Sequence, residues 1–216
     1  MRISVIVPTL DAGDCLASCL VSLGQADEII VADGGSTDAT LAIALTAGAK
    51  IITSEAGRGV QLAKGAAAAC GEALLFVHAD TRLSPGWRAL AEQHCASSRR
   101  PACFRLRLDD PASQARLIEC AVSLRTRLAG LPYGDQGLLV PRAAYDAAGG
   151  FRPLPLMEDV DLIRRLARPV MLDGDALTSS RRWRRDGWIR RSLRNLTCLS
   201  LWRLGVSPAR IAKLYA

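Results

Sequence analysis

The sequence predicts an α/β protein in which a mostly parallel sheet is flanked by helices. Half of its 216 residues are hydrophobic and 23% are charged, which is the composition of a folded domain. In the first half, short β-branched runs alternate with segments of helical periodicity. Strand–helix–strand repeats of this length form parallel strands joined by right-handed crossovers.

Four strands are expected in this half because their residues are apolar and mostly β-branched: 3–7, 28–31, 49–53 and 73–77. Helices are expected between them, where apolar residues recur at helical spacing and glycines mark the ends: 14–23, 37–47 and 58–69.

The second half is less regular. Helices are expected where the periodicity returns: 85–96, 113–128, 157–166, 188–204 and a short one from 208. Strands are expected at three shorter runs: 103–108, 138–140 and 170–172. The predicted division is a domain at 1–180 and a helical tail at 181–216.

The net charge of +7 lies in the tail. Residues 181–216 hold ten Lys or Arg and one acid, hence +9, whereas residues 1–180 hold eighteen bases and twenty acids, hence −2. A nucleic-acid-binding domain is expected to have a basic face. The near-neutral body therefore argues against nucleic acid as a partner.

The cysteines and the N-terminus predict a cytoplasmic protein. The seven cysteines are odd in number and lack metal-binding spacing, so reduced thiols are expected. The N-terminal run is too short and too β-branched for a signal peptide, and no apolar stretch reaches the ~18 residues of a membrane span.

Acidic residues follow three of the predicted strands. Asp11 follows the first strand, Asp33 the second and Asp80 the fourth. The carboxyl ends of parallel strands form the ligand crevice of an open sheet. Three carboxylates at one edge predict a cation or a hydrogen-bonding ligand, although each acid alone is also compatible with a helix cap.

Three clusters carry the candidate chemistry. Asp33 opens a glycine-containing turn that lets a ligand approach the backbone. Asp80 is the natural ligand for Mg²⁺ or Mn²⁺, and His78 is a weaker partner or an ordinary buried histidine. Glu158 and Asp159 open a helix after a Gly/Pro-rich loop, where a carboxylate acts either as a cap or as a general base.

Taken together, these clusters resemble a family 2 glycosyltransferase over almost the whole chain. Residues 6–10 resemble its first strand, residues 31–38 its nucleotide-binding turn, and residues 78–80 its metal-binding Asp-x-Asp motif. Glu158 and Asp159 match its Glu-Asp pair, and residues 182–183 resemble the Arg-Trp that ends its Gln-x-x-Arg-Trp motif. Four strings further resemble the bacterial subgroup associated with radical-SAM/selenodomain proteins: residues 57–61, 78–81, 133–137 and 155–159.

The resemblance implies a GT-A (Rossmann-like) fold and inverting, metal-dependent transfer of a sugar from a nucleoside-diphosphate sugar, with UDP the expected nucleotide, to an acceptor hydroxyl. It implies that Asp159 is the base, with Glu158 beside it, and that Asp80 holds the divalent cation. The implied donor-binding residues are Pro8, Thr9, Asp11, Asp33, Gly34, Arg58 and Ala79. The implied acceptor-side residues are Gly134, Asp135, Gln136, Arg182 and Trp183.

This sequence departs from the family's motifs at two positions, and other hypotheses therefore stay open. His78 replaces the first Asp of the metal motif, and Ser179 stands at the Gln of the last motif, which argues against a processive polysaccharide synthase. One alternative is a nucleotidyltransferase, although these place a basic glycine-rich loop where this chain has the acidic residues 11–14. The other is a nucleotide-sugar-binding or membrane-tethering module without activity.

The tail supports two interpretations. A helix with apolar residues and arginines at 188–204 is suited to an anionic membrane surface. In that case the protein is peripheral on the inner face of the plasma membrane, and its acceptor is lipid-linked. Alternatively, the helix packs on the domain and leaves its arginines in water.

Overall fold

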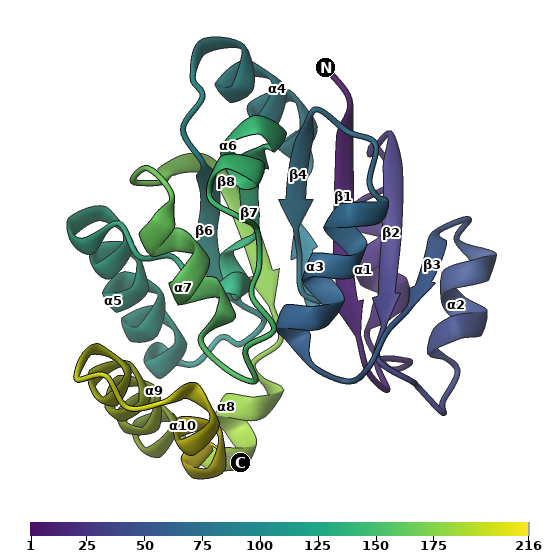
Figure 1. The fold of residues 1–216 in the computed structure, drawn as a ribbon. Helices are drawn as coiled ribbons and strands as arrows, with labels where there is room; N and C mark the ends of the chain where they lie inside the picture. The colour runs from purple at the N-terminus through teal and green to yellow at the C-terminus, as the bar shows by residue number, and fades with distance from the viewer. Residues whose placement is uncertain (216) are drawn as a thin grey trace.

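Eight strands form one sheet in the computed structural model, which describes residues 1–215 (Figure 1). The strand order is β3-β2-β1-β4-β7-β6-β8-β5. The first half supplies the four predicted strands: β1 (Ile3–Thr9), β2 (Glu28–Asp33), β3 (Lys50–Thr53) and β4 (Ala73–Phe76). All three pairings among them are parallel, as the alternating pattern predicted.

The second half extends the sheet with mixed pairings. It contains β5 (Thr81–Leu83), β6 (Ala102–Leu108), β7 (Leu138–Pro141) and β8 (Val170–Thr178). Strand β7 is antiparallel to both β4 and β6, whereas β8 is parallel to β6 and antiparallel to β5. Strand β5 was not predicted from the sequence.

Strand β8 is nine residues long, so the predicted limits 170–172 were wrong. Its centre, Asp173-Gly174-Asp175, has the composition of a turn. Arg105 on the neighbouring β6 forms ion pairs with both of these aspartates, at 2.9 Å each. Cross-strand charge pairing therefore keeps in the sheet a segment that favours a turn.

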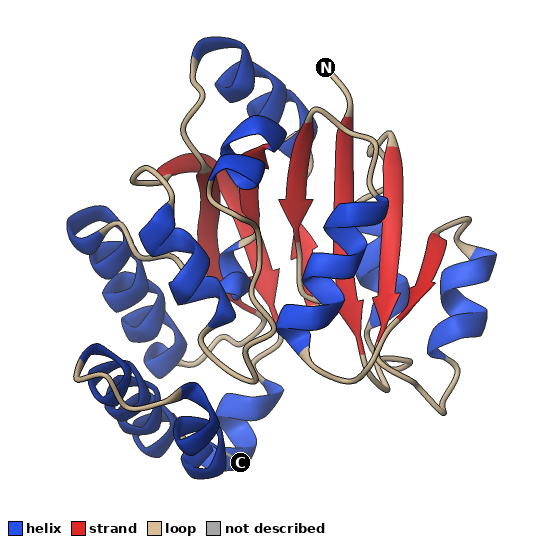
Figure 2. Ribbon diagram, in the orientation of Figure 1, coloured by secondary structure: helices blue, strands red, loops and turns tan. Residues whose placement is uncertain are grey.

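The helices cover both sides of the sheet (Figure 2). Eight correspond to predicted segments: α1 (Leu16–Ser22), α2 (Thr40–Thr46), α3 (Arg58–Ala68), α4 (Trp87–Ser97), α5 (Ser113–Ala129), α7 (Glu158–Arg165), α9 (Trp188–Arg203) and α10 (Pro208–Tyr215). Two were not predicted: α6 (Arg142–Ala147) and α8 (Arg181–Asp186). Helix α8 lacks apolar periodicity because its sequence, RRWRRD, is almost entirely charged.

Two apolar clusters lie on opposite faces of the sheet. Val5 and Val7 of β1 belong to the cluster under α1 and α4, whereas Ile6 belongs to the cluster under α3 and α7. This assignment follows the alternation of side chains along a strand. All three residues are fully buried, which explains why β1 is a continuous apolar run and not an alternating one.

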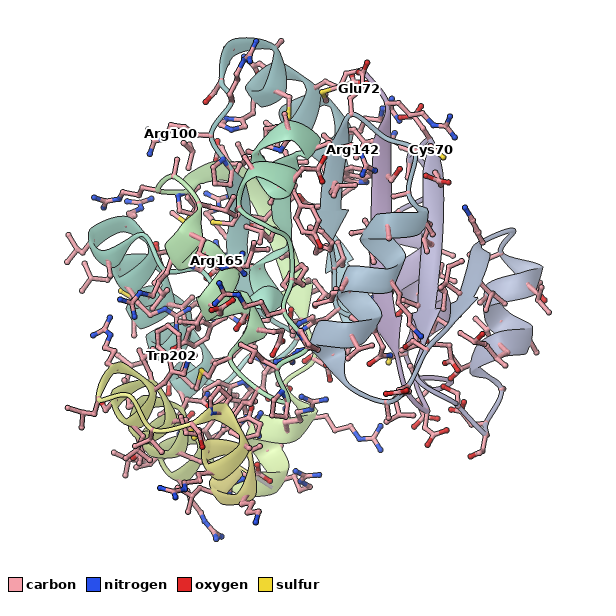
Figure 3. The ribbon with its side chains drawn as sticks, viewed as in Figure 1. Cys70, Glu72, Arg100, Arg142, Arg165 and Trp202 are labelled. Carbon is pink, nitrogen blue, oxygen red and sulfur yellow. The ribbon has the colours of Figure 1, made fainter. Side chains whose placement is uncertain are left out.

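The carboxyl ends of β1, β2 and β4 converge at the end of the sheet nearest α8 (Figure 1). Cys70, Glu72 and Arg142 mark the opposite end (Figure 3). There Arg142 donates hydrogen bonds to the carbonyl oxygens of Ala69 and Gly71, at 2.7 Å each. These bonds connect α6 to the segment that precedes β4.

The tail packs on the rest of the protein. Cys198 and Leu199 of α9 and Ile211 of α10 are buried in the same cluster as Leu162 of α7. The last residue of the predicted tail, 216, lies outside the described residues. Within residues 1–215, no helix has the length and apolarity that crossing a membrane requires.

We predict that Gly65→Ala destabilises the protein. A Cβ at Gly65 would lie 2.5 Å from Cγ2 of Ile6, which is buried in β1 and unable to move away. Overpacking of this kind costs about 1–3 kcal/mol. Helix propensity alone would instead stabilise the protein by about 1 kcal/mol, because alanine favours a helix more than glycine does. Urea unfolding measures the difference, with Ala67→Ser on the exposed side of α3 as the control.

Candidate active site

Asp33 organises the turn at the end of β2. Its side chain is 1% exposed and accepts four hydrogen bonds: from Thr9 Oγ1 (2.9 Å), the Gly35 and Ser36 amides (2.9 and 2.8 Å) and Ser36 Oγ (2.5 Å). Burial opposes the ionised form, but these hydrogen bonds outweigh it and hold the pKa of Asp33 below its ordinary value. The carboxylate is thus directed into the protein.

Gly34 and Gln61 complete this turn. Gln61 is buried and donates from Nε2 to the carbonyl oxygens of Thr9 (2.6 Å) and Ala32 (2.9 Å), so it joins the ends of β1 and β2. A Cβ on Gly34 would lie 3.1 Å from that same nitrogen. Asp33 and Gly34, both predicted donor contacts, therefore shape the site from beneath and do not line it.

A cleft of about 570 Å³ opens above this turn. Of the predicted donor-binding residues, it is lined by Pro8, Thr9, Asp11, Arg58 and Ala79. Its volume lies in the range typical of sites for small ligands. Three arginines of the first turns of α8 also line it, namely Arg181, Arg182 and Arg185. Of these three, only Arg182 was predicted from the sequence to belong to the site.

Asp11 connects the cleft to the turn. Its carboxylate accepts a hydrogen bond from the Thr37 amide at 2.8 Å, and its own amide donates a hydrogen bond to Ser36 Oγ at 2.9 Å. Its φ of 47° lies in the left-handed region, which residues other than glycine seldom adopt. This strained backbone positions the acidic edge of the cleft.

A second, smaller space of about 110 Å³ adjoins the cleft, and we call it the cavity. Asp80 lies where the cleft and the cavity meet. The two spaces share five lining residues: Arg58, His78, Asp80, Ser179 and Arg182. Within residues 1–215, the Asp80 side chain forms no ion pair.

Burial, together with Arg58 and Arg182, holds the pKa of His78 well below its ordinary value, so this ring is neutral at pH 7.

The cavity has one wall made by the loop before β7 together with α7, and one made by the tail. Tyr133, Gly134, Asp135 and Asp159 line the first wall. Side chains of α8, α9 and α10 line the second: Arg182, Trp183, Arg191, Asn195, Cys198 and Tyr215. The last four of these were not assigned to the site from the sequence, because nothing in an amphipathic pattern shows which wall a helix completes.

Asp159 is oriented by the backbone. Its Oδ2 accepts the Gly134 amide at 2.9 Å, and its Oδ1 accepts the Val160 amide at 2.7 Å. Gly134 itself packs against His78, since a Cβ there would lie 2.5 Å from Nε2 of the ring. Glycine is therefore required for the loop to reach both side chains.

Glu158 does not face the cavity. It is 1% exposed, and its Oε1 accepts a hydrogen bond from Nε of Arg58. The other oxygen, Oε2, is buried and has no hydrogen-bond partner among the described residues. Burial raises the pKa of Glu158, although Arg58 opposes this. The pair joins the first residues of α3 and α7 and holds Arg58 between the cleft and the cavity.

Asp135 and Gln136 have different surroundings, although both were predicted on the acceptor side. Asp135 lines the cavity, and its Oδ1 is buried without a hydrogen-bond partner in the described chain. Gln136 is fully buried: its Oε1 accepts from Thr126 Oγ1 (3.0 Å), and its Nε2 donates to the Phe104 carbonyl (3.1 Å). The prediction for Gln136 was wrong in its geometry, because this side chain fixes the loop to α5 and β6.

In residues 1–215, no group of three or more His, Cys, Asp or Glu side chains is arranged to hold a metal ion. The cysteines likewise form no such cluster there, and the described ones are free thiols. Any cation at Asp80 would therefore take most of its ligands from a bound substrate and from water.

Comparison with known proteins places the N-terminal part of the chain near sugar transferases. Residues 4–98 match the family described as Glycosyl transferase family 2. Glucosyl-3-phosphoglycerate synthase of Mycolicibacterium paratuberculosis is 37% identical over 92 residues, which cover 36% of this chain and 28% of that protein. The chain thus spans less than a third of the length of this relative.

Solved structures show that the chain has the GT-A fold. Glucosyl-3-phosphoglycerate synthase from Mycobacterium tuberculosis, in complex with Mn²⁺, UDP and phosphoglyceric acid, aligns with a TM-score of 0.57 at 21% identity, covering 79% of this chain and 67% of that chain. TarS of S. aureus, in complex with UDP-GlcNAc, aligns with a TM-score of 0.60 at 20% identity, covering 83% and 58%.

We predict that Asp135→Asn stabilises the protein at neutral pH but not in acid. Burial raises the pKa of Asp135 to about 6, with Arg125 opposing and Asp159 and Asp80 adding to the rise. A raised carboxyl pKa means that folding becomes less favourable as pH rises from about 4 through 6. The substitution is expected to raise the free energy of unfolding by about 1–3 kcal/mol at pH 8 and to leave it almost unchanged at pH 3.5. Denaturant unfolding at both pH values measures it, and Asp146→Asn on exposed α6 is the control.

Proposed function

We propose that this protein is an inverting, metal-dependent glycosyltransferase that transfers a sugar from a nucleoside-diphosphate sugar to an acceptor hydroxyl. The observation that carries the proposal is the position of Asp80, between a nucleotide-sized cleft and a cavity that contains Asp159. A transferase needs two adjoining substrate sites with a general base on the acceptor side of their junction, and this arrangement supplies both.

The donor is assigned to the cleft. Asp11 in its lining suits the hydroxyls of a nucleoside, and Arg181, Arg182 and Arg185, which also line it, suit a diphosphate. Asp33 and Gly34 act indirectly, by fixing the turn under the nucleoside. UDP is the proposed nucleotide, since the glucosyl-3-phosphoglycerate synthase and TarS structures contain UDP or a UDP sugar.

A divalent cation fits the junction. Mg²⁺ and Mn²⁺ bind one or two protein carboxylates together with substrate phosphates, and Asp80 offers one carboxylate that no basic side chain neutralises in the described residues. The uncharged ring of His78 does not repel a cation. When bound, the cation neutralises charge that develops on the departing diphosphate.

The acceptor is assigned to the cavity, where Asp159 is the proposed base. The acceptor oxygen attacks the anomeric carbon, the bond from that carbon to the phosphate oxygen breaks, and its electron pair leaves with the nucleoside diphosphate. The acceptor proton passes to the carboxylate of Asp159, which the Gly134 amide holds in place. Because the attack is a single displacement, the anomeric configuration inverts.

The acceptor site has further proposed contacts. Asp135, Gly134, Arg182 and Trp183 are proposed acceptor contacts because they line the cavity, whereas Glu158 supports the base through Arg58. The division at residue 180, the lipid-linked acceptor and the radical-SAM/selenodomain-associated subgroup rest on sequence patterns. Release of a nucleoside diphosphate, and not pyrophosphate, separates this proposal from a nucleotidyltransferase.

We predict that Asp159→Asn abolishes transfer and preserves donor binding. Loss of a positioned general base costs about 10²–10⁴ in rate. The measurement is UDP release from a panel of UDP sugars with Mn²⁺, in the presence of acceptors and as slow hydrolysis in their absence, alongside calorimetric binding of UDP. Asp146→Asn, at an exposed position on α6, is the matched control. Full transfer by the Asp159 variant would refute its assignment as the base.

We predict that Asp80→Asn removes the benefit of the cation for donor binding. UDP binding should weaken by about tenfold or more in Mn²⁺, which corresponds to about 1.4 kcal/mol, and change little in EDTA. Thermal shift with UDP, with and without Mn²⁺, reports this, because a ligand that binds the folded state raises the melting temperature. An equal loss of affinity with and without metal would contradict a role as cation ligand.

A further inference from the structure

Helix α9 exposes an apolar stripe to solvent. Ile189, Leu193, Leu196 and the adjoining Leu204 are 77%, 58%, 59% and 81% exposed. At 3.6 residues per turn, these four side chains fall within about 80° of one another. We call them the outer stripe. An exposed apolar surface of this kind marks an interaction site.

Cations border the outer stripe on both sides. Arg190 and Arg203 are exposed, and neither forms an ion pair within residues 1–215. Helix α9 contains no Asp or Glu at all. Arg210 and Lys213 of the neighbouring helix α10 are exposed as well and form no ion pair within residues 1–215. The surface is thus apolar at its centre and positive at its rim.

The opposite side of α9 faces the cavity. Arg191, Asn195 and Cys198 line that space. Arg191 is buried and donates hydrogen bonds to Asp186 (2.7 Å) and to the hydroxyl of Tyr215 (2.9 Å). Arg164 of α7 lies over the ring of Trp202, which Figure 3 labels. These contacts fix the rotation of α9, so the outer stripe stays directed to solvent.

We propose that the outer stripe docks into the interface of an anionic lipid bilayer. Leucine and isoleucine insert at the boundary between headgroups and acyl chains, and flanking arginines bind anionic headgroups. A second copy of the chain is disfavoured as the occupant, because pairing two such helices would bring their arginines together without a single acid on either. This proposal goes beyond the reaction and names a partner surface.

Docking in this way would bring the acceptor site to the membrane. The cavity lies on one side of α9 and the outer stripe on the other, so one helix diameter, about 10–12 Å, separates them. An acceptor carried by a lipid would then meet the cavity near the bilayer surface.

The test is co-sedimentation of the full chain with phosphatidylcholine vesicles, with and without phosphatidylglycerol. We expect sedimentation only with the anionic vesicles, decreasing with salt as surface electrostatics are screened. The variant Leu193→Glu/Leu196→Glu should reduce binding by about tenfold or more. The control Val21→Glu/Leu45→Glu changes net charge equally at exposed sites on α1 and α2 and should bind like the wild type.

Melting temperatures and UDP binding of each variant show whether it is folded, and Leu193→Ser/Leu196→Ser replaces the glutamate variant if it is not. Equal sedimentation of the stripe variant and the wild type would overturn the proposal, as would failure of the wild type to sediment. A wild-type dimer in light scattering that the stripe variant breaks, without vesicle binding, would assign the stripe to a second copy instead. Since no sugar transfer is measured, failure here is distinguishable from failure of the proposed reaction.

Discussion

The ion pair between Arg58 and Glu158 is the contact on which the site depends. It joins the first residue of α3, which connects β3 to β4 in the parallel part of the sheet, to the first residue of α7, which precedes β8 in the mixed part. Glu158 is almost completely buried, so its charge relies on Arg58 for compensation. Burial opposes the charge of Arg58 as well, but Glu158 and Asp159 raise its pKa and keep it cationic. One guanidinium thereby fixes the spacing between the cleft and the cavity.

The same region concentrates negative charge that the protein does not fully neutralise. Asp80, Asp135 and Asp159 all line the cavity, and Asp135 has an oxygen without a partner in the described chain. Burial, with like charges adding to it, makes ionisation costly, which is why the pKa of Asp135 rises. A protein retains such an arrangement where a ligand compensates for it, and a cation with a diphosphate is one that would. Stability and function are therefore in conflict at this edge of the sheet.

The sequence allowed the fold to be predicted well where local pattern and tertiary environment agree. The parallel strands and the acids at their ends are examples, since β-branched runs and their spacing suffice to define them. The pattern failed for β8, whose Asp173 and Asp175 are kept in the sheet by arginines on β6. It also failed for side-chain direction. Asp33, at the end of β2, and Gln136 lie where they were expected but point inward, and partners distant in sequence, Thr9 and Phe104, contribute to that orientation.

Helix α9 shows why the tail was the hardest segment to interpret. An amphipathic helix normally buries its apolar side and exposes its cations. Here part of the pattern is reversed: Arg191 is buried, whereas Leu193 and Leu196 are exposed. The buried arginine is tolerated because Asp186 and Tyr215, from the two ends of the tail, satisfy its guanidinium. The tail thus has its own polar core beside the cavity, and several of its leucines remain on the outside. The sequence shows both sets of residues, but only the packing shows which set faces the protein.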